Sequence, residues 1–335
     1  MIRLTILFLL CLPTTLLGED FSDLYEKLSP TVVTIHTSNN SGLKQTSTNG
    51  LGTGIVIEND KIITAAHVVH TASSIQVKFK DGYTAEAEIV TSIPASDVAL
   101  LRLINPPANI IIAETADSKS VRIGEPVFVI GAPFGIEHTL SVGNLSGRMS
   151  RGLMAGGEPV SLLQTDTAIN QGNSGGPMFN KDGKVIGIVS FILSKSGGFN
   201  GIGFAVSING AMNSLLQASD FWLGFDGILL SPEFAAAINI PQPTGMLVQH
   251  VVTGSAAEKA GLRGGKVEIS MAGNTISLGG DVVLAIAGIV CDGPHSFDDI
   301  KNHVASLPDD EGFVVSVLRG GRFVELKVAP RNADI

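Results

Sequence analysis

Cysteine and aromatic residues are scarce in this sequence of 335 residues. It contains two cysteines, one tryptophan and two tyrosines. Cys11 lies in the apolar N-terminal stretch, and removal of that stretch would leave Cys291 as the only cysteine. A disulfide within one mature chain is then excluded. The fold must rest on its hydrophobic core, for which 44% hydrophobic residues are ample.

Charge is also scarce, and positive charge most of all. Charged residues make up 16% of the chain, and 22 basic residues stand against 31 acidic ones, a net charge of −9. Such a chain has no electrostatic attraction for a phosphate backbone, so we predict no nucleic-acid partner. No cluster of His, Cys and Asp has the spacing of metal ligands, and we predict no metal and no other cofactor.

A long apolar run is missing as well. Residues 1–18 contain one basic residue, Arg3, followed by an apolar run interrupted by Pro13. This pattern is typical of a secretory signal peptide. The run is shorter than the roughly 20 residues that span a bilayer. We predict cleavage after Gly18 and a periplasmic or secreted protein; a membrane anchor formed by an uncleaved segment is the alternative.

Short β-branched runs separated by turn pairs fill the chain from Thr31 to about Ser207. About a dozen such runs, with no useful helical period between them, indicate an antiparallel barrel or sandwich. Tight hairpin turns that need positive φ are expected at three pairs: Asn59-Asp60, Asp81-Gly82 and Asp182-Gly183. A helix expected over 209–220 would close this domain near residue 219.

The remainder of the chain mixes strands with two helices. Ser255 and Glu258 form a capping box before a helix that Gly261 ends, and Ser296 is expected to cap a second helix. A hairpin should turn at Gly320-Gly321. These features predict a second domain of about 110 residues. The expected divisions are 1–18, 19–219, 220–331 and a tail at 332–335.

The stretch "QGNSGGP" at 171–177 fits two nucleophile patterns. It satisfies the G-x-S-x-G elbow of α/β-hydrolases, which would make the protein an esterase, and it also reads like the serine loop of a chymotrypsin-like protease. The elbow needs a helix after Ser174 and its histidine later in the chain. Here a β-hairpin pattern follows, and His250, His295 and His303 all lie in the second domain. The elbow is therefore disfavoured.

Upstream residues complete the protease pattern. His67 follows a strand in "TAAHVV", and Asp97 begins a strand in "SDVALLRL". The order His, Asp, Ser is that of chymotrypsin-type enzymes. A serine hydroxyl is a weak nucleophile until an imidazole accepts its proton, and that imidazole needs a carboxylate to fix its tautomer. We predict a triad of His67, Asp97 and Ser174.

An oxyanion hole is expected in Gly172, Asn173 and Ser174. Without a side chain, Gly172 allows its N–H to approach a substrate carbonyl together with the N–H of Ser174. His70, three residues after His67, is a rival base that no motif supports.

With "TAAHVV", "SDVALL" and "TDTAINQGNSGGP", the chain resembles the HtrA/Deg family of trypsin-fold serine proteases with a C-terminal PDZ domain. The resemblance covers nearly the whole mature chain. It implies a mainly β fold, with a chymotrypsin-like double β-barrel over 19–219 and one PDZ domain over 220–331. It carries the catalytic roles to His67, Asp97 and Ser174. "DLYEKLSPTVVTI" resembles the opening strand of the family.

The resemblance implies further sites. Trp222, Leu223, Gly224 and Phe225 stand where a PDZ domain binds peptide C-termini, and "KVEISMAGNTISLGG" inserts what reads as an extra hairpin. Such a loop offers backbone N–H groups to a terminal carboxylate while the peptide joins a sheet edge. Arg151 is the candidate switch residue of a sensor loop that couples PDZ occupancy to the active site.

The residue at the base of the specificity pocket, six before the serine, is Ala168. It offers no carboxylate to a Lys or Arg side chain. Ile169, Ile202 and Phe204 suggest a pocket for small or medium aliphatic side chains. Because the segment before "GTGIVI" is short, a homotrimer is expected from the resemblance rather than a larger cage.

The predicted function is that of an ATP-independent serine endopeptidase that degrades unfolded or damaged envelope proteins. The alternative is a peptide-binding chaperone or regulatory scaffold with a largely latent protease site.

Overall fold

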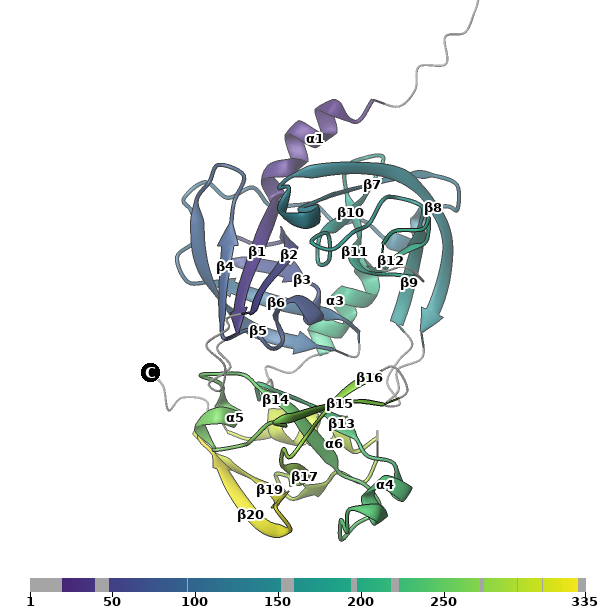
Figure 1. The fold of residues 1–335 in the computed structure, drawn as a ribbon. Helices are drawn as coiled ribbons and strands as arrows, with labels where there is room; N and C mark the ends of the chain where they lie inside the picture. The colour runs from purple at the N-terminus through teal and green to yellow at the C-terminus, as the bar shows by residue number, and fades with distance from the viewer. Residues whose placement is uncertain are drawn as a thin grey trace, which may run out of the picture.

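The computed structural model describes residues 20–39, 48–94, 96–151, 160–193, 198–217, 223–271, 274–293, 295–308 and 310–330. These residues form two closed β-barrels and a smaller C-terminal domain, which lies below the barrels in Figure 1. The predicted signal peptide at 1–18, the boundary near 219 and the tail at 332–335 lie outside the described residues, so these divisions stay predictions.

The first barrel closes in the order β1-β2-β3-β6-β5-β4. Alternate apolar residues fill it, as Val33 and Ile35 of β1 do at 0% exposure. Its strands are β1 (Val32–Asn39), β2 (Thr48–Val56), β3 (Lys61–Thr64), β4 (Ser74–Lys78), β5 (Thr84–Ile93) and β6 (Val98–Leu103).

The second barrel closes in the order β10-β11-β12-β9-β8-β7. Its strands are β7 (Pro126–Gly131), β8 (Thr139–Arg151), β9 (Val160–Thr165), β10 (Pro177–Asn180), β11 (Val185–Ile192) and β12 (Gly203–Ser207). The predicted antiparallel double barrel is therefore confirmed.

One apolar cluster takes residues from both barrels. Ile55 and Ile63 of the first barrel are buried with Phe128 and Phe179 of the second, whose rings stack with centroids 5.1 Å apart. Burial of this shared surface holds the barrels side by side. The loops at the seam between them are fixed as a consequence.

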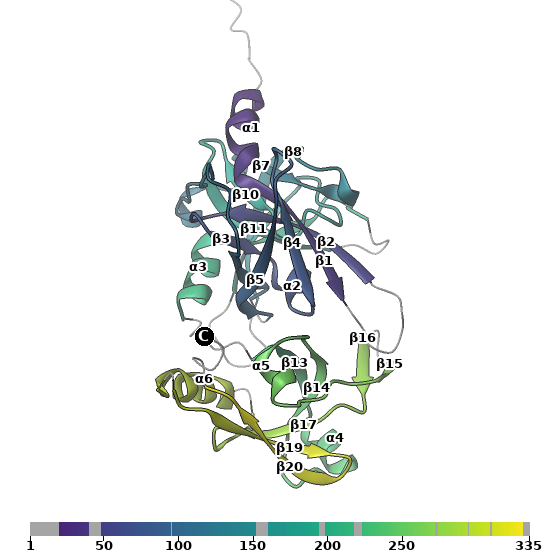
Figure 2. The ribbon, with the colours of Figure 1, turned by 90° about the vertical axis from the view of Figure 1, so that its left-hand side faces the viewer.

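Short helices join or flank the strands: α1 (Ser22–Leu28), η1 (Ser29–Thr31), α2 (Ala66–Val69), η2 (Ser118–Ser120), η3 (Pro133–Gly135) and α3 (Ile208–Gln217). The expected helix over 209–220 is confirmed by α3. In Figures 1 and 2, α1 projects from the barrels at the end opposite the C-terminal domain.

The expectation that "DLYEKLSPTVVTI" forms one opening strand is wrong for its first half. Residues 22–28 are helical, and the strand starts only at Val32. Leu24 and Leu28 are four residues apart, so a helix places both on one face, where they pack on the shared apolar cluster. Pro30 cannot continue the α-helix, and the chain turns into the strand.

Two of the three predicted tight turns are confirmed. Gly82 and Gly183 have φ of 89° and 74°, conformations that glycine adopts without steric cost. The expectation of positive φ at Asn59-Asp60 is wrong, because neither residue adopts it. A two-residue turn does form at this pair, since the Lys61 N–H donates to the Glu58 carbonyl (3.3 Å) and the Glu58 N–H to the Lys61 carbonyl (3.4 Å), but it closes without a left-handed residue.

The C-terminal domain is built on a sheet of order β13-β14-β17-β19-β20, with β18 paired to β17. A separate hairpin, β15–β16, confirms the extra hairpin expected from "KVEISMAGNTISLGG". The elements are β13 (Phe225–Leu229), α4 (Pro232–Ala237), β14 (Met246–Val251), α5 (Ala256–Lys259), β15 (Val267–Met271), β16 (Asn274–Leu278), β17 (Val282–Ile286), β18 (Ile289–Val290), α6 (Ser296–Ser306), β19 (Phe313–Arg319) and β20 (Arg322–Val328).

The helix caps of this domain follow the sequence only in part. Ser255 Oγ accepts the N–H of Glu258 at 3.2 Å, as expected. The Glu258 carboxylate accepts the N–H of Gly254 (2.6 Å). Ser296 is not a cap: it is the first residue of α6, and its hydroxyl donates to the Gly293 carbonyl at 2.6 Å. The Ser296 N–H donates to the same carbonyl at 3.2 Å, so both donors of this serine are used by Gly293 and its hydroxyl does not bond to the N–H groups of the helix.

Cys291 is fully buried in the core of the same domain. Burial, aided by the neighbouring charge of Asp292, raises the pKa of its thiol to about 12.

The stacked phenylalanines give a test of the shared cluster. Replacing Phe179 with Ala should lower the free energy of unfolding by about 3–5 kcal/mol, because a large ring is removed from a packed site. Phe323→Ala, at a position that is 69% exposed, is the matched control and should change it by less than about 0.5 kcal/mol. Urea denaturation measures both; equal effects would contradict the assignment of the cluster as the core.

Candidate active site

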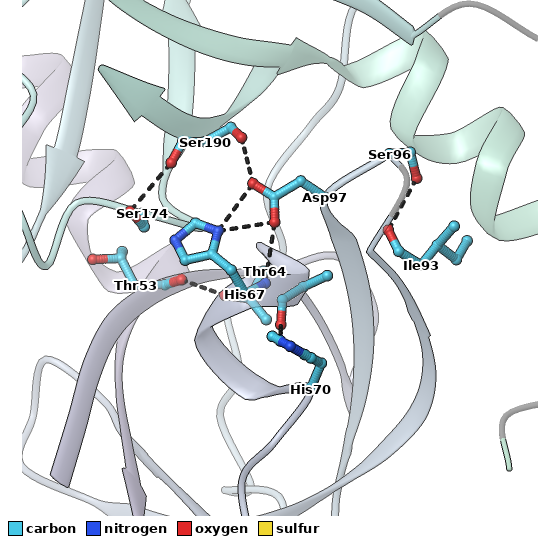
Figure 3. A network of polar contacts seen from close by, with 10 residues as sticks. Thr53, Thr64, His67, His70, Ile93, Ser96, Asp97, Ser174 and Ser190 are labelled. Atoms are coloured by element: carbon cyan, nitrogen blue, oxygen red, sulfur yellow. Dashed lines mark hydrogen bonds and ion pairs between the residues drawn. The ribbon is translucent and has the colours of Figure 1, made fainter. Parts of the chain in front are cut away.

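Three segments meet at the seam between the barrels (Figure 3). His67 lies on α2, directly after β3; Asp97 lies directly before β6; and Ser174 lies in a turn before β10. Because a strand follows Ser174, the α/β-hydrolase elbow, which needs a helix there, does not fit this structure.

The His67 imidazole is held by the Asp97 carboxylate. Nδ1 of His67 lies 2.8 Å from Oδ1 and 3.0 Å from Oδ2 of Asp97, and the His67 backbone N–H donates to Oδ1 at 3.1 Å. Since a carboxylate only accepts, Nδ1 carries the proton in the neutral ring. Nε2 is then left with its lone pair, as a general base requires.

Ser190 on β11 is a second partner of Asp97 that sequence reasoning missed. Its hydroxyl donates to Oδ2 of Asp97 (Figure 3). Burial alone would raise the pKa of the Asp97 carboxyl, but the hydrogen bonds from His67 and Ser190 outweigh it and hold this pKa below its usual value. Asp97 also has a φ of 54°, which is uncommon for a residue other than glycine.

The hydroxyl of Ser174 donates to the carbonyl oxygen of Ser190 at 3.3 Å. Among the described residues, no hydrogen bond joins this hydroxyl to His67. Ser174 lies close to the imidazole of His67 (Figure 3), but its hydroxyl is turned toward Ser190; we call this the resting orientation. Such bonds commonly form only when substrate is bound.

The turn of Ser174 leaves two N–H groups available. The Gln171 carbonyl accepts the Phe134 N–H at 2.8 Å, and the Asn173 N–H donates to the Asn170 carbonyl at 3.0 Å. Within the described chain, the N–H groups of Gly172 and Ser174 have no acceptor. Of the three residues expected to form the hole, Gly172 and Ser174 thus offer donors, and Asn173 shapes the turn between them.

Gly172 has a φ of 102°, and a Cβ there would collide with the carbonyl oxygen of Ala132. Only glycine fits this position without strain.

Thr53 of β2 ties the serine turn to the first barrel, although no motif marks it. Its hydroxyl donates to the Gly172 carbonyl at 2.6 Å and accepts the Ala132 N–H at 3.1 Å. Its backbone N–H donates to the Ser174 carbonyl at 2.9 Å, and Thr64 donates to its carbonyl at 2.7 Å.

The predicted pocket residues belong to different parts of the second barrel. Ile169 is buried in the core of the second barrel. Phe204 belongs to the cluster between the barrels, where it stacks on Phe191, and Ile202 packs against that cluster. Ala168 is exposed.

The remaining candidates come from the end of β8 and from the start of the C-terminal domain. Arg151 ends β8, and the loop that follows it lies outside the described residues, as does Trp222. Leu223, Gly224 and Phe225 lead into β13 of the C-terminal domain.

His70, the rival base, is not part of the triad. Its Nδ1 lies 3.1 Å from the Ala66 carbonyl oxygen, and its Nε2 lies 3.4 Å from Oδ2 of Asp226 in the C-terminal domain. Across the described ranges, no group of three or more His, Cys, Asp or Glu side chains is placed to hold a metal ion. Nor does any described helix have the length and apolar character to cross a membrane.

Residues 52–188 match the family model described as a trypsin-like peptidase domain. The match includes His67, Asp97 and Ser174. Together with two six-stranded barrels, it defines a peptidase domain of the chymotrypsin-like class.

Proteins of similar sequence include periplasmic serine endoproteases. The chain is 34% identical over 297 residues to the periplasmic serine endoprotease DegP of Escherichia coli (strain K12), and 34% identical over 285 residues to a probable periplasmic serine endoprotease DegP-like of Pseudomonas putida (strain GB-1). The alignments cover 86% and 81% of this chain but only 58% and 59% of those proteins.

Solved structures agree with these relatives. The HtrA-type protease AlgW with decapeptide superposes with a TM-score of 0.53 at 26% identity, covering 93% of this chain and 98% of that one. AlgW with tripeptide gives 0.53 at 28% identity, covering 93% and 96%. The chain is therefore similar to HtrA-type proteases, and it contains a trypsin-like peptidase domain over residues 52–188.

Thr53 offers a test of the link between the barrels. Thr53→Val removes the hydroxyl and leaves the Gly172 carbonyl and the Ala132 N–H buried without their partner. The free energy of unfolding should fall by about 1–3 kcal/mol. Thr53→Ser keeps the hydroxyl and is the matched control. Urea denaturation of both variants decides the point; a loss in Thr53→Ser as large as that in Thr53→Val would contradict the special importance of the hydroxyl.

Asp97 should make stability depend on pH. Its folded pKa is lowered, so its contribution is present above the unfolded value of about 3.9 and is lost as the pH falls through the folded value. The difference in free energy of unfolding between wild type and Asp97→Asn should be largest near about pH 6 and should shrink below about pH 4. Denaturation across this range measures it; a constant difference would refute the depressed pKa.

Proposed function

We propose that this chain is an ATP-independent serine endopeptidase in which Ser174 is the nucleophile, His67 the general base and Asp97 the group that orients it. One observation carries the proposal. The His67–Asp97 pair lies beside a serine turn in which two backbone N–H groups have no acceptor within the described chain. This is the arrangement that acyl transfer requires.

In the proposed reaction, the Ser174 hydroxyl turns from the Ser190 carbonyl toward Nε2 of His67 and attacks the peptide carbonyl as Nε2 takes its proton. The N–H groups of Gly172 and Ser174 stabilise the developing oxyanion. The imidazolium, stabilised by Asp97, protonates the leaving amine. Water, activated by His67, then hydrolyses the acyl-enzyme.

We propose unfolded or damaged envelope proteins as substrates. The periplasmic relatives support a periplasmic location. With Ala168 at the pocket base there is no carboxylate to pair with a basic side chain, which favours small or medium aliphatic residues at the cleavage site. A homotrimer is proposed from the same family resemblance.

The C-terminal domain is proposed to be a PDZ domain that binds peptide C-termini for recognition or activation. Within the described sheet, β13 pairs only with β14 and is an edge strand. An edge offers unpaired N–H and C=O groups to an added peptide strand. The carbonyls of Leu223 and Gly224 accept the N–H groups of Ala257 and Val252, at 2.9 Å and 2.8 Å, which fixes the loop before that strand.

A fluorophosphonate probe tests the nucleophile directly. Incubated with residues 19–335, it should label Ser174, as located by peptide mass spectrometry, because only an activated serine reacts quickly. His67→Ala should abolish labelling, and Ser174→Ala removes the target. Digestion of unfolded casein should fall by about 10⁴-fold in Asp97→Asn.

The resting orientation of Ser174, bonded to Ser190, also suits the alternative of a chaperone or scaffold with a latent site. Absence of labelling, even with short peptides that carry free C-termini added to the protein, would support that alternative and overturn the protease.

A further inference from the structure

Asp226 lies where the C-terminal domain contacts the segment that carries His67. It is on β13, and its carboxylate lies between two imidazoles. Nε2 of His70, the residue that follows α2, is 3.4 Å from Oδ2. Nδ1 of His250, on the neighbouring strand β14, is 3.1 Å from Oδ1, which also accepts the His250 backbone N–H at 2.8 Å.

Both nitrogens of His70 face oxygen acceptors. Nδ1 lies 3.1 Å from the Ala66 carbonyl, and Nε2 faces the Asp226 carboxylate. A neutral imidazole has one N–H and can satisfy only one of them, whereas the imidazolium donates to both. The geometry at this contact therefore favours the doubly protonated ring.

The Asp226 carboxylate stays ionised at neutral and mildly acidic pH. Burial alone would raise its pKa, but the hydrogen bonds from His250 and His70 outweigh burial and hold the pKa far below its usual range. In the described chain, these two imidazoles are the titratable groups that face it.

The described strands packed against α2 carry other charged side chains, but none of them forms an ion pair with His70 or Asp226. On β5 and β6, Glu88 and Arg102 form an ion pair with each other, and Glu86 is exposed. His67, on α2 itself, is bonded to Asp97.

The contact between Asp226 and His70 lies at the end of a very short helix. Helix α2 is a single turn, Ala66–Val69, closed by a bond of 2.8 Å from the His70 N–H to the Ala66 carbonyl. His67 is the second residue of that turn. His70 and Asp226 have side chains only 22% and 25% exposed, so water screens their attraction only in part.

We propose that Asp226 is a positioning residue for His67, acting through His70: its contact with His70 joins the C-terminal domain to the first barrel and steadies the single helical turn that carries the general base. The inference rests on the proposed function and adds one contact through which the C-terminal domain acts on the site.

The test compares Asp226→Asn with wild type in the digestion of unfolded casein. The kcat of Asp226→Asn should be about fivefold lower than that of wild type, with KM unchanged, because the substitution loosens the turn that carries His67 and touches no substrate group.

Asp292→Asn is the matched control. Asp292 forms an ion pair of 3.3 Å with His295 inside the C-terminal domain, so the charge change is the same but the domain contact is kept. Its kcat should equal that of wild type. An unchanged kcat in Asp226→Asn, or an equal loss in the control, would overturn the proposal.

A double-mutant cycle with His70→Gln checks the pair itself. The double variant should lose no more than either single variant, because each removes the same contact. Additive losses would show that Asp226 does not act through His70.

Small-angle scattering of the Ser174→Ala chain reads the domain contact without any activity. The radius of gyration should be larger when Asp226→Asn is added to this chain. A radius independent of Asp226 would refute the link. An inactive wild type whose radius still responds to Asp226→Asn would refute the proposed function alone.

Discussion

The hydrogen bonds of Thr53 join the two halves of the candidate active site. The base and its carboxylate belong to the first barrel, whereas the nucleophile and both candidate oxyanion donors belong to the second. Thr53 bonds to the chain on both sides of Asn173, at the Gly172 and Ser174 carbonyls. Those carbonyls thereby point toward the first barrel, and the N–H groups of Gly172 and Ser174 stay without an acceptor within the described chain.

The apolar cluster between the barrels supplies most of the free energy that holds them together, which the hydrogen bonds of Thr53 cannot. A few hydrogen bonds fix an orientation, but they contribute little net free energy once the lost bonds to water are counted. The ring stack of Phe128 and Phe179, with the aliphatic residues around it, excludes water from the interface. Hydrophobic burial holds the barrels together, and the hydrogen bonds set the loops at their edge.

Features that depend on neighbouring residues could be predicted from the sequence. The turns at Asp81-Gly82 and Asp182-Gly183 are examples, because glycine tolerates a left-handed conformation. The order of His67, Asp97 and Ser174 follows from a shared chemistry, and the structure brings the three together. At Asn59-Asp60 the turn forms where the pair predicts it, but it closes without a positive φ, because some tight turns keep both central residues in the right-handed region.

Contacts between segments far apart in the chain could not be predicted from the sequence. Ser190 is one serine in an apolar strand, and Thr53 is a threonine between two glycines; neither carries a signal of the partner it meets across the seam. Ser296 was expected to be a helix cap because serine is common at that position, but its hydroxyl donates to the Gly293 carbonyl instead. His70 seemed a rival base, and only the packing of the second domain reveals Asp226 beside it.

The burial of Cys291 has a practical side. A thiol reacts as its thiolate, and a pKa of about 12 together with complete burial keeps that form both rare and inaccessible while the domain is folded. Among the described residues it is the only cysteine. The protein thus carries its own reporter of C-terminal domain opening: a thiol that stays silent toward alkylating reagents until this domain, rather than either barrel, comes apart.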